Sequence, residues 1–218
     1  MRKMANKNPK KIIQYNEIEI VGANDIRTRT GNAQRKIAYL SKKLDLDYSY
    51  IYTIYCELFP DISPVAFKND EAMGYIASII GGCLDYNKKT TDYSNAFIFI
   101  KQWAVLPKYR YKKCEVINKD GKNTSIMEML TNNLIKNAKK YKIDKFILTI
   151  KENNTASLNL AKRTAANNGL KIYSPGYIKY GPYNNYEQEN YWIIAKNPKK
   201  VAEDLKNAGY LKNMQNYE

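Results

Sequence analysis

The chain has 218 residues, no histidine and three cysteines, and 36 Lys and Arg residues against 21 Asp and Glu residues give it a net charge of +15. This length fits one domain, or one domain with a tail. Without imidazole, catalytic triads and metal sites that depend on His are excluded. The number and spacing of the cysteines argue against a disulfide framework or a zinc site, so we expect a reduced, cytoplasmic protein. The longest apolar stretch, 73–84, is about half of a membrane span, and no membrane partner is expected.

The positive charge is spread over the whole sequence rather than gathered in one segment. Only 6 of the 36 basic residues are Arg, whereas DNA-binding surfaces commonly use Arg for bidentate contacts with bases. Lys, Asn, Ile and Tyr, whose codons are rich in A and T, are all abundant. We therefore interpret the lysine excess as compositional bias and do not expect specific nucleic-acid recognition. A basic nucleic-acid-binding accessory protein is the alternative from another functional class.

The first part of the chain predicts a strand and two helices. Residues 1–11 are basic and no signal-length apolar segment follows them, so we expect a disordered arm. The β-rich stretch 12–21 predicts an opening strand. Apolar residues at helical spacing between Asn32 and Leu58 predict two short helices, the second ending before Pro60.

The rest of the domain alternates strands and helices. Three β-branched and aromatic segments predict an antiparallel meander: 64–67, 73–84 and 96–105. A capping-box pattern at Ser125–Glu128 predicts a helix to about Tyr141. A buried strand, a helix capped by Asn154 or Thr155, and two closing strands then follow, over 145–150, 154–169, 172–180 and 191–195. The polar segment 196–218 is expected to form a tail or a weakly docked helix.

The predicted order of elements is β-α-α-β-β-β-α-β-α-β-β. It predicts an α/β (α+β) fold with a mixed, largely antiparallel central sheet and helices on both faces. A strand, a helix and a parallel strand make a right-handed crossover, so strands 96–105 and 145–150 should lie side by side. The N-terminus of the helix between them would point at the gap between the strand ends, where an anion is favoured.

This order resembles the GCN5-related N-acetyltransferases over roughly residues 12–195, with Val105-Leu106-Pro107 leaving the fourth strand and Asn153-Asn154 following the fifth. The resemblance implies acetyl-CoA as co-substrate and no metal. It also implies that the pantetheine arm lies between these two strands, with the pyrophosphate on backbone N–H groups of the helix. The implied cofactor-binding residues are Trp103, Ala104, Val105, Arg110, Gly121, Lys122, Asn123, Thr124, Ser125, Ile126, Asn154 and Ser157.

The family's phosphate loop, Gln/Arg-x-x-Gly-x-Gly/Ala, is imperfect in this chain. Arg110 is followed by a segment that looks like an insertion, 111–120, before the sequence Gly121–Ile126. If Ile126 is the first core residue of the helix, Asn123 and Ser125 take the glycine positions. An ordinary flexible loop with a helix cap is the alternative interpretation.

Several short segments also resemble, in the same order, the L-2,4-diaminobutyrate acetyltransferases of ectoine synthesis: Leu44–Tyr50, Pro64–Phe67, Met73–Ile76, Phe99–Val105 and Asn154–Ser157. Carried over by position, Asp45 and Tyr50 are the candidate catalytic residues at the acceptor end, where a carboxylate would hold the substrate's ammonium group. A solvated residue at a helix end is the alternative interpretation of Asp45.

Two departures from these enzymes bear on the acceptor. Ile147 stands where they have a substrate-binding glutamate, and Lys101 stands where they have a tryptophan. Diaminobutyrate should therefore be a poor substrate, and Lys101 would favour an acceptor with a carboxylate or phosphate near its amine. The general-acid tyrosine of many family members falls on Ala161, so another phenol is needed, with Tyr173, Tyr177 and Tyr180 as candidates.

The sequence thus predicts direct transfer of an acetyl group to a primary amine, either a small amine or a diamino acid. A backbone N–H group near 103–105 would stabilise the oxyanion. The alternative acceptor is a protein or a tRNA-linked amine, for which the charge of +15 would attract an acidic partner. A homodimer is one oligomeric state left open.

Overall fold

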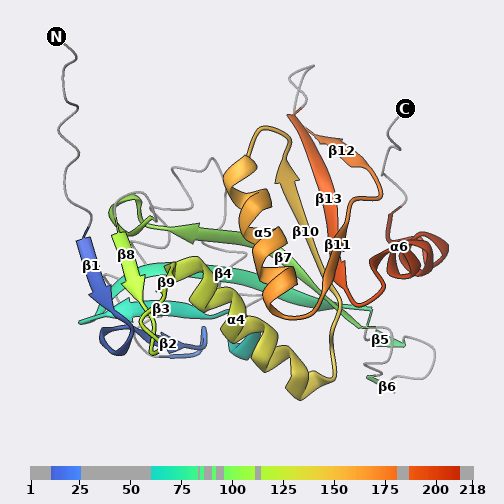
Figure 1. Ribbon diagram of the computed structural model, residues 1–218. Helices are drawn as coiled ribbons and strands as arrows, with labels where there is room; N and C mark the ends of the chain where they lie inside the picture. The colour runs from blue at the N-terminus through green and yellow to red at the C-terminus, as the bar shows by residue number, and fades with distance from the viewer. Residues whose placement is uncertain are drawn as a thin grey trace, which may run out of the picture.

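The computed structural model describes residues 11–25, 60–82, 84–85, 90–91, 96–110, 114–180 and 187–211 (Figure 1). The two predicted helices between Asn32 and Leu58 lie outside these ranges. So do the candidate catalytic residues Asp45 and Tyr50, most of the predicted basic arm and the last residues of the predicted tail. None of the helices in the described ranges is long and apolar enough to cross a membrane.

Eight strands form the central sheet, in the order β11-β13-β10-β7-β4-β3-β2, with β12 also paired to β13. Their bounds are β2 (Glu19–Val21), β3 (Val65–Lys68), β4 (Glu71–Gly81), β7 (Phe97–Val105), β10 (Phe146–Lys151), β11 (Lys171–Tyr173), β12 (Tyr177–Tyr180) and β13 (Glu187–Ala195). Only β7 and β10 are parallel to each other, and the other paired strands of this sheet are antiparallel. The mixed, largely antiparallel sheet, the meander β3-β4-β7 and the neighbouring strands β7 and β10 are therefore confirmed.

Helix α4 (Ile126–Ala138) connects β7 to β10, as the capping-box pattern predicts. Ser125 accepts a hydrogen bond from the backbone of Glu128, and the Glu128 side chain accepts one from the backbone of Ser125. Leu130, Leu134 and Ala138 repeat at a spacing of four and are fully buried. The last turn is a 3-10 helix, η4 (Lys139–Tyr141), which ends where Lys142 adopts a φ of 56°.

Helices cover both faces of the sheet, as expected. Side chains alternate between the two faces of a strand. Ile98, Leu148 and Ile194 belong to the large core that includes α4 and α5 (Thr155–Asn167). Their neighbours in the strands, Phe97, Ile147 and Ile193, pack instead with Val201, Ala202 and Leu205 of α6 (Pro198–Asn207).

The segment 196–211 is thus a packed part of the fold rather than a tail. Asn197 caps α6 through its side chain, and Pro198 occupies the first turn, where the missing N–H group costs nothing. Leu205 and Leu211 are both buried against the sheet. The spacing of Val201 and Leu205 correctly indicates a helix. Ala202 and Leu211 pack in the same apolar cluster, which the sequence interpretation did not include.

The single opening strand predicted over 12–21 is wrong. The 3-10 helix η1 (Tyr15–Glu17) divides this stretch, and β1 (Lys11–Gln14) pairs in parallel with β8 (Cys114–Ile117) in a separate sheet. The third strand of that sheet is β9 (Asn123–Thr124). Residues 111–120, which look like an insertion in the sequence, thus contain a strand whose Cys114 and Val116 are buried.

Two smaller corrections concern the closing strands and the region before β7. The predicted strand 172–180 is two strands, β11 and β12, and Pro175, which has no N–H group for a ladder, lies between them. A short hairpin, β5 (Leu84–Asp85) and β6 (Thr90–Thr91), lies between β4 and β7.

Candidate functional site

Strands β7 and β10 lie side by side over only part of their length. Ile98, Phe99 and Ile100 pair with residues 146–148 of β10, and the Ile98 N–H group donates to the Lys145 carbonyl at 2.8 Å. Beyond Ile100 the two strands diverge, as Figure 1 shows, although β7 continues to Val105 and β10 to Lys151. The divergence leaves the backbone of β7 beyond Ile100 without a strand partner on the β10 side among the described residues.

A β-bulge marks the point of divergence. Ser78 of β4 lies opposite Ile100, whereas the preceding Ala77 lies opposite Gln102, so that Lys101 is the extra residue of β7. A bulge of this kind bends the strand and re-aims the side chains that follow it. The interrupted pairing with β10 and the bulge therefore fall at adjacent residues, Ile100 and Lys101.

Beyond the bulge, the alternation of β7 side chains between the two faces of the sheet is shifted by one residue. Directly opposed residues of antiparallel strands place their side chains on the same face. Gln102 therefore shares a face with Ala77, and the Tyr75 hydroxyl donates to its Oε1 at 2.6 Å. Lys101 points to this same face, since its Nζ lies 4.5 Å from the centre of the Phe99 ring. Two successive polar side chains thus lie on the face away from α4.

Gln102 is buried, whereas Lys101 keeps contact with solvent. Gln102 is 7% exposed, and its Nε2 has no hydrogen-bond partner within the described part of the chain. Burial lowers the pKa of Lys101. On β13, burial raises the pKa of Tyr191, and the nearby Glu189 raises it further. Phe99 and Tyr191 pack against the same apolar cluster, so the β7 and β13 groups border one region of this face.

The predicted cofactor-binding residues of β7 lie on its diverging part. Ala104 is buried, and Trp103 and Val105 pack against the large core. Both polar groups of the Val105–Leu106 peptide are bonded within the chain: the Leu106 N–H group donates to the Met73 carbonyl of β4 at 2.9 Å, and the Val105 carbonyl accepts from Arg110 Nε at 3.1 Å. Arg110 therefore folds back onto the end of β7.

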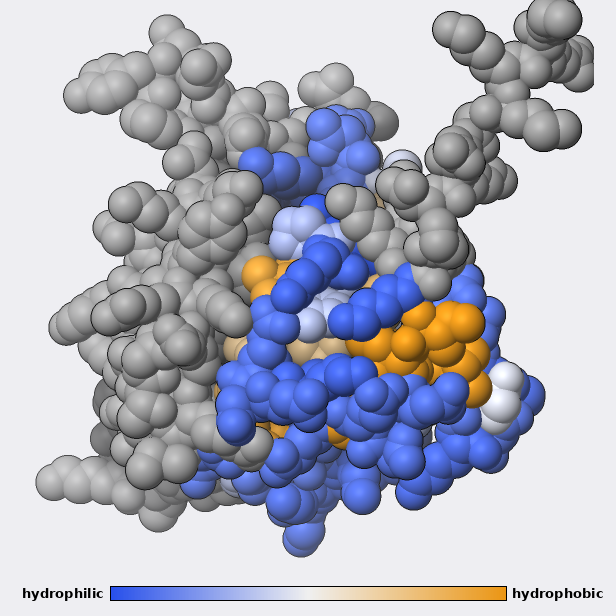
Figure 2. Space-filling view, turned by 90° about the vertical axis from the view of Figure 1, so that its left-hand side faces the viewer, coloured by the Kyte–Doolittle hydropathy of each residue, from blue (hydrophilic) through white to orange (hydrophobic). Residues whose placement is uncertain are grey.

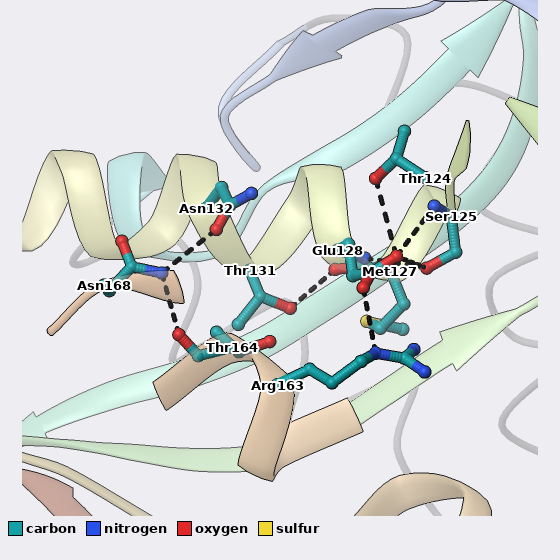
Figure 3. Close-up of polar contacts among 9 residues, drawn as sticks. All are labelled: Thr124, Ser125, Met127, Glu128, Thr131, Asn132, Arg163, Thr164 and Asn168. Carbon is teal, nitrogen blue, oxygen red and sulfur yellow. Dashed lines mark hydrogen bonds and ion pairs between the residues drawn. The ribbon is translucent and has the colours of Figure 1, made fainter. Parts of the chain in front are cut away.

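The first turn of α4 holds its own carboxylate (Figure 3). Glu128 Oε2 accepts hydrogen bonds from Ser125 N–H at 3.0 Å and Ser125 Oγ at 2.9 Å, and it lies 3.5 Å from Thr124 Oγ1. Its other oxygen lies 3.1 Å from Nε of Arg163, which belongs to α5. Two amide groups of this turn, those of Ile126 and Met127, have no carbonyl partner within the helix, as at any helix start.

The remaining predicted cofactor-binding residues lie either at the start of α5 or in the β8-β9 hairpin. Asn154 caps α5, with its Oδ1 accepting from the Ser157 N–H group at 3.1 Å. Gly121 and Lys122 lie in the exposed turn of the β8-β9 hairpin, where Gly121 has a φ of 72°. Asn123 is a residue of β9, so the glycine-like conformation of this loop occurs at Gly121 rather than at Asn123 or Ser125.

The two positions at which this chain lacks the family's tyrosine and glutamate are both buried. Ala161 is fully buried in α5 and Ile147 is buried beneath α6. Of the alternative phenols, Tyr173 and Tyr177 are half-buried on β11 and β12, and Tyr180 ends β12. The polar groups that the sequence interpretation missed are those of Tyr75, Gln102, Tyr191 and Glu189. Nothing in the sequence predicts the bulge that brings Gln102 to this face.

Figure 2 shows the side of the molecule on which β1, β8 and β9 lie. Hydrophilic residues cover most of the described surface there, and the largest hydrophobic area in this view lies at its right-hand side. Ile12 of β1 is 62% exposed. Ile12 and Tyr210 are the exposed large hydrophobic residues within the part of the chain that the structure describes.

No protein-family model matches the sequence, and no curated protein sequence matches it. Solved structures do match. Diaminobutyrate acetyltransferase EctA from Paenibacillus lautus, in complex with L-2,4-diaminobutyric acid and coenzyme A, has a TM-score of 0.60 at 16% identity, covering 83% of this chain and 95% of that one. Arabidopsis thaliana Naa50, in complex with the bisubstrate analogue CoA-Ac-MVNAL, has a TM-score of 0.57 at 16% identity, covering 81% and 97%.

A GNAT-family acetyltransferase from Streptococcus pneumoniae also matches, with a TM-score of 0.52 at 16% identity, over 81% of this chain and 98% of that one. The chain has the GNAT acetyltransferase fold. At such identities the likeness extends to the fold alone. EctA is only one of several proteins with a similar structure, so the structural matches do not favour the diaminobutyrate acetyltransferases over other members of the fold.

Proposed function

We propose that the protein is an acetyl-CoA-dependent N-acetyltransferase that transfers the acetyl group directly to a primary amine. The observation that supports this most strongly is the divergence of β7 and β10 at the Lys101 bulge, within a GNAT fold. An extended ligand with amide groups can take the place of the missing strand, because backbone groups at a strand edge pair with such ligands.

The residues around the divergence suit the parts of acetyl-CoA. The backbone of Trp103 to Val105 would pair with the amides of the pantetheine arm. The free amide groups of Ile126 and Met127 and the cations of Arg110 and Arg163 would hold the pyrophosphate. The carboxylate of Glu128 opposes this, and its ion pair with Arg163 partly offsets the opposing charge.

The transfer itself needs an amine that has lost its proton, a donor for the oxyanion and a proton for the departing thiolate. We assign the oxyanion to a backbone N–H group near the end of β7. Asp45 would accept the ammonium proton through water, and a phenol such as Tyr173, Tyr177 or Tyr180 would supply the proton to sulfur. The proposal includes no covalent enzyme intermediate.

The acceptor we propose is a small amine or a diamino acid, with Asp45 and Tyr50 at its end of the site. The alternative, a protein or tRNA-linked amine, is favoured by the net charge of +15. Among proteins of similar fold, Naa50 was solved with a peptide-containing bisubstrate analogue and EctA with diaminobutyric acid, so the fold accommodates both classes.

A screen of amines for CoA release by the purified protein tests the activity. Small amines, amino acids, peptides and aminoacyl-tRNA should be compared at a fixed acetyl-CoA concentration. We expect acetylation of at least one small amine, confirmed by the mass of its product. Activity restricted to peptides or aminoacyl-tRNA, with loss at high salt, would favour the alternative acceptor.

A further inference from the structure

The amide of Gln102 is a buried donor at the point where β7 leaves β10. The side chain is 7% exposed, and its Oε1 is used by the Tyr75 hydroxyl at 2.6 Å, while Nε2 has no partner within the described ranges. Buried polar groups in native proteins are almost always paired, so such a donor calls for an explanation. An oxygen of a bound ligand would provide the missing acceptor.

The residue before this donor carries a cation on the same face of the sheet. Lys101 and Gln102 are adjacent in sequence, and the bulge directs both side chains away from α4. The Lys101 Nζ lies 4.5 Å from the centre of the Phe99 ring, and the residue as a whole is exposed to solvent. Burial lowers the pKa of Lys101, and an anion beside it would reverse this shift.

We infer that the bulge of β7 binds a carboxylate of the acceptor amine, with Gln102 Nε2 and Lys101 Nζ as the two donors. This inference rests on the proposed acetyltransfer and narrows its acceptor to an amino acid. A carboxylate offers several lone pairs, so one oxygen can accept from the amide and the other from the ammonium group. A charged acceptor is favoured over a neutral amide because Lys101 gains a charge-assisted bond with it.

Matched amines with and without a carboxylate test the inference. Alanine should be compared with alaninamide and ethylamine, and diaminobutyrate with 1,3-diaminopropane. We expect kcat/KM to favour a carboxylate-bearing amine over its decarboxylated counterpart by about 10-fold or more, the effect of one charge-assisted hydrogen bond. Ratios measured within each variant remove the differences in amine basicity.

Three variants and a control locate the effect. Lys101→Met and Gln102→Met should each lower the preference by about 10-fold, while Lys101→Arg should retain most of it. Lys136→Met, which removes an exposed lysine of α4, should behave as the unaltered protein. Each variant should keep the acetyl-CoA-induced rise in Tm, which shows that it folds and binds the co-substrate.

A binding measurement needs no turnover. Propionate, which is alanine without its amine, should raise the Tm of the CoA-saturated protein but not that of either Met variant. The inference is overturned if alanine and alaninamide are used equally well, if ethylamine matches alanine, if propionate gives no shift, or if the preference survives in both Met variants. Because acetyl-CoA binding is measured separately, loss of that binding marks failure of the proposed function instead.

Discussion

Arg163 Nε of α5 lies 3.1 Å from Glu128 Oε1 of α4. The pair joins α4, which lies between β7 and β10 in the chain, to α5, which follows β10. Glu128 is the less exposed partner, with 15% of its side chain accessible against 56% for Arg163. The same carboxylate closes the first turn of α4 through Ser125.

Replacing Glu128 with glutamine should affect stability and co-substrate affinity in opposite directions. Glu128→Gln keeps an oxygen for the Ser125 N–H group but loses the charge that favours a helix start, so stability should fall by about 1 kcal/mol. Removing an anion beside the proposed phosphate site should tighten acetyl-CoA binding about 5-fold. Urea unfolding and titration calorimetry measure the two effects.

Glu203→Gln is the matched control, because it makes the same charge change on the exposed face of α6. It should leave both quantities close to those of the unaltered protein. Unchanged or weaker acetyl-CoA binding in Glu128→Gln would mean that the first turn of α4 does not face the phosphates.

Gly74 is required by the close approach of β4 to the end of β7. A Cβ atom at this position would lie 2.7 Å from the Ala104 carbonyl oxygen and 3.0 Å from Val105 Cγ2. Gly74→Ala should therefore push the two strands apart and lower the free energy of unfolding by about 1–3 kcal/mol. Equal urea midpoints for the variant and the unaltered protein would show that the strands adjust without cost.

The sequence predicts the elements around Gly74 and α4 well because each has a local cause. Stretches rich in β-branched and aromatic residues predict β4 and β7, and Ser125 and Glu128 form the predicted capping box. The α4 crossover then places β7 beside β10. These features depend on residues close together in the chain, so periodicity and capping chemistry are sufficient to find them.

What the sequence misses depends on distant pairing. Lys11–Gln14 forms a strand because β8 offers it a parallel partner about one hundred residues later along the chain. The bulge at Lys101 exists only in relation to Ala77 and Ser78 of the neighbouring strand. Gln102, a polar residue within an apolar strand, therefore gave no sign in the sequence of the face to which it would turn.

The acceptor end can be tested through two residues outside the described ranges. If Asp45 holds the ammonium group, Asp45→Asn should raise KM for the amine while leaving acetyl-CoA affinity nearly unchanged, because it removes a charge-assisted bond of about 1.5–3 kcal/mol. Tyr50→Phe should give a smaller loss. Full activity of Asp45→Asn on the best amine from the screen would place the acceptor site elsewhere.

The lysine excess makes a separate prediction about nucleic acid. If it reflects composition alone, the protein should bind duplex DNA only weakly, and counterion release should abolish this binding by roughly 200 mM salt. Fluorescence anisotropy with a labelled duplex at increasing salt measures this. Binding that persists at higher salt, or that differs between two duplex sequences, would support the nucleic-acid alternative.

The central claim is that the gap between β7 and β10 binds acetyl-CoA, and thermal unfolding with and without acetyl-CoA tests it most directly. A ligand that binds only the folded state stabilises it by about 2.7 kcal/mol at a concentration one hundred times its Kd, which raises Tm by several degrees. We expect such a rise with acetyl-CoA, and a smaller one in Arg110→Ala, which loses a proposed phosphate partner. An unchanged Tm at millimolar acetyl-CoA would contradict the claim.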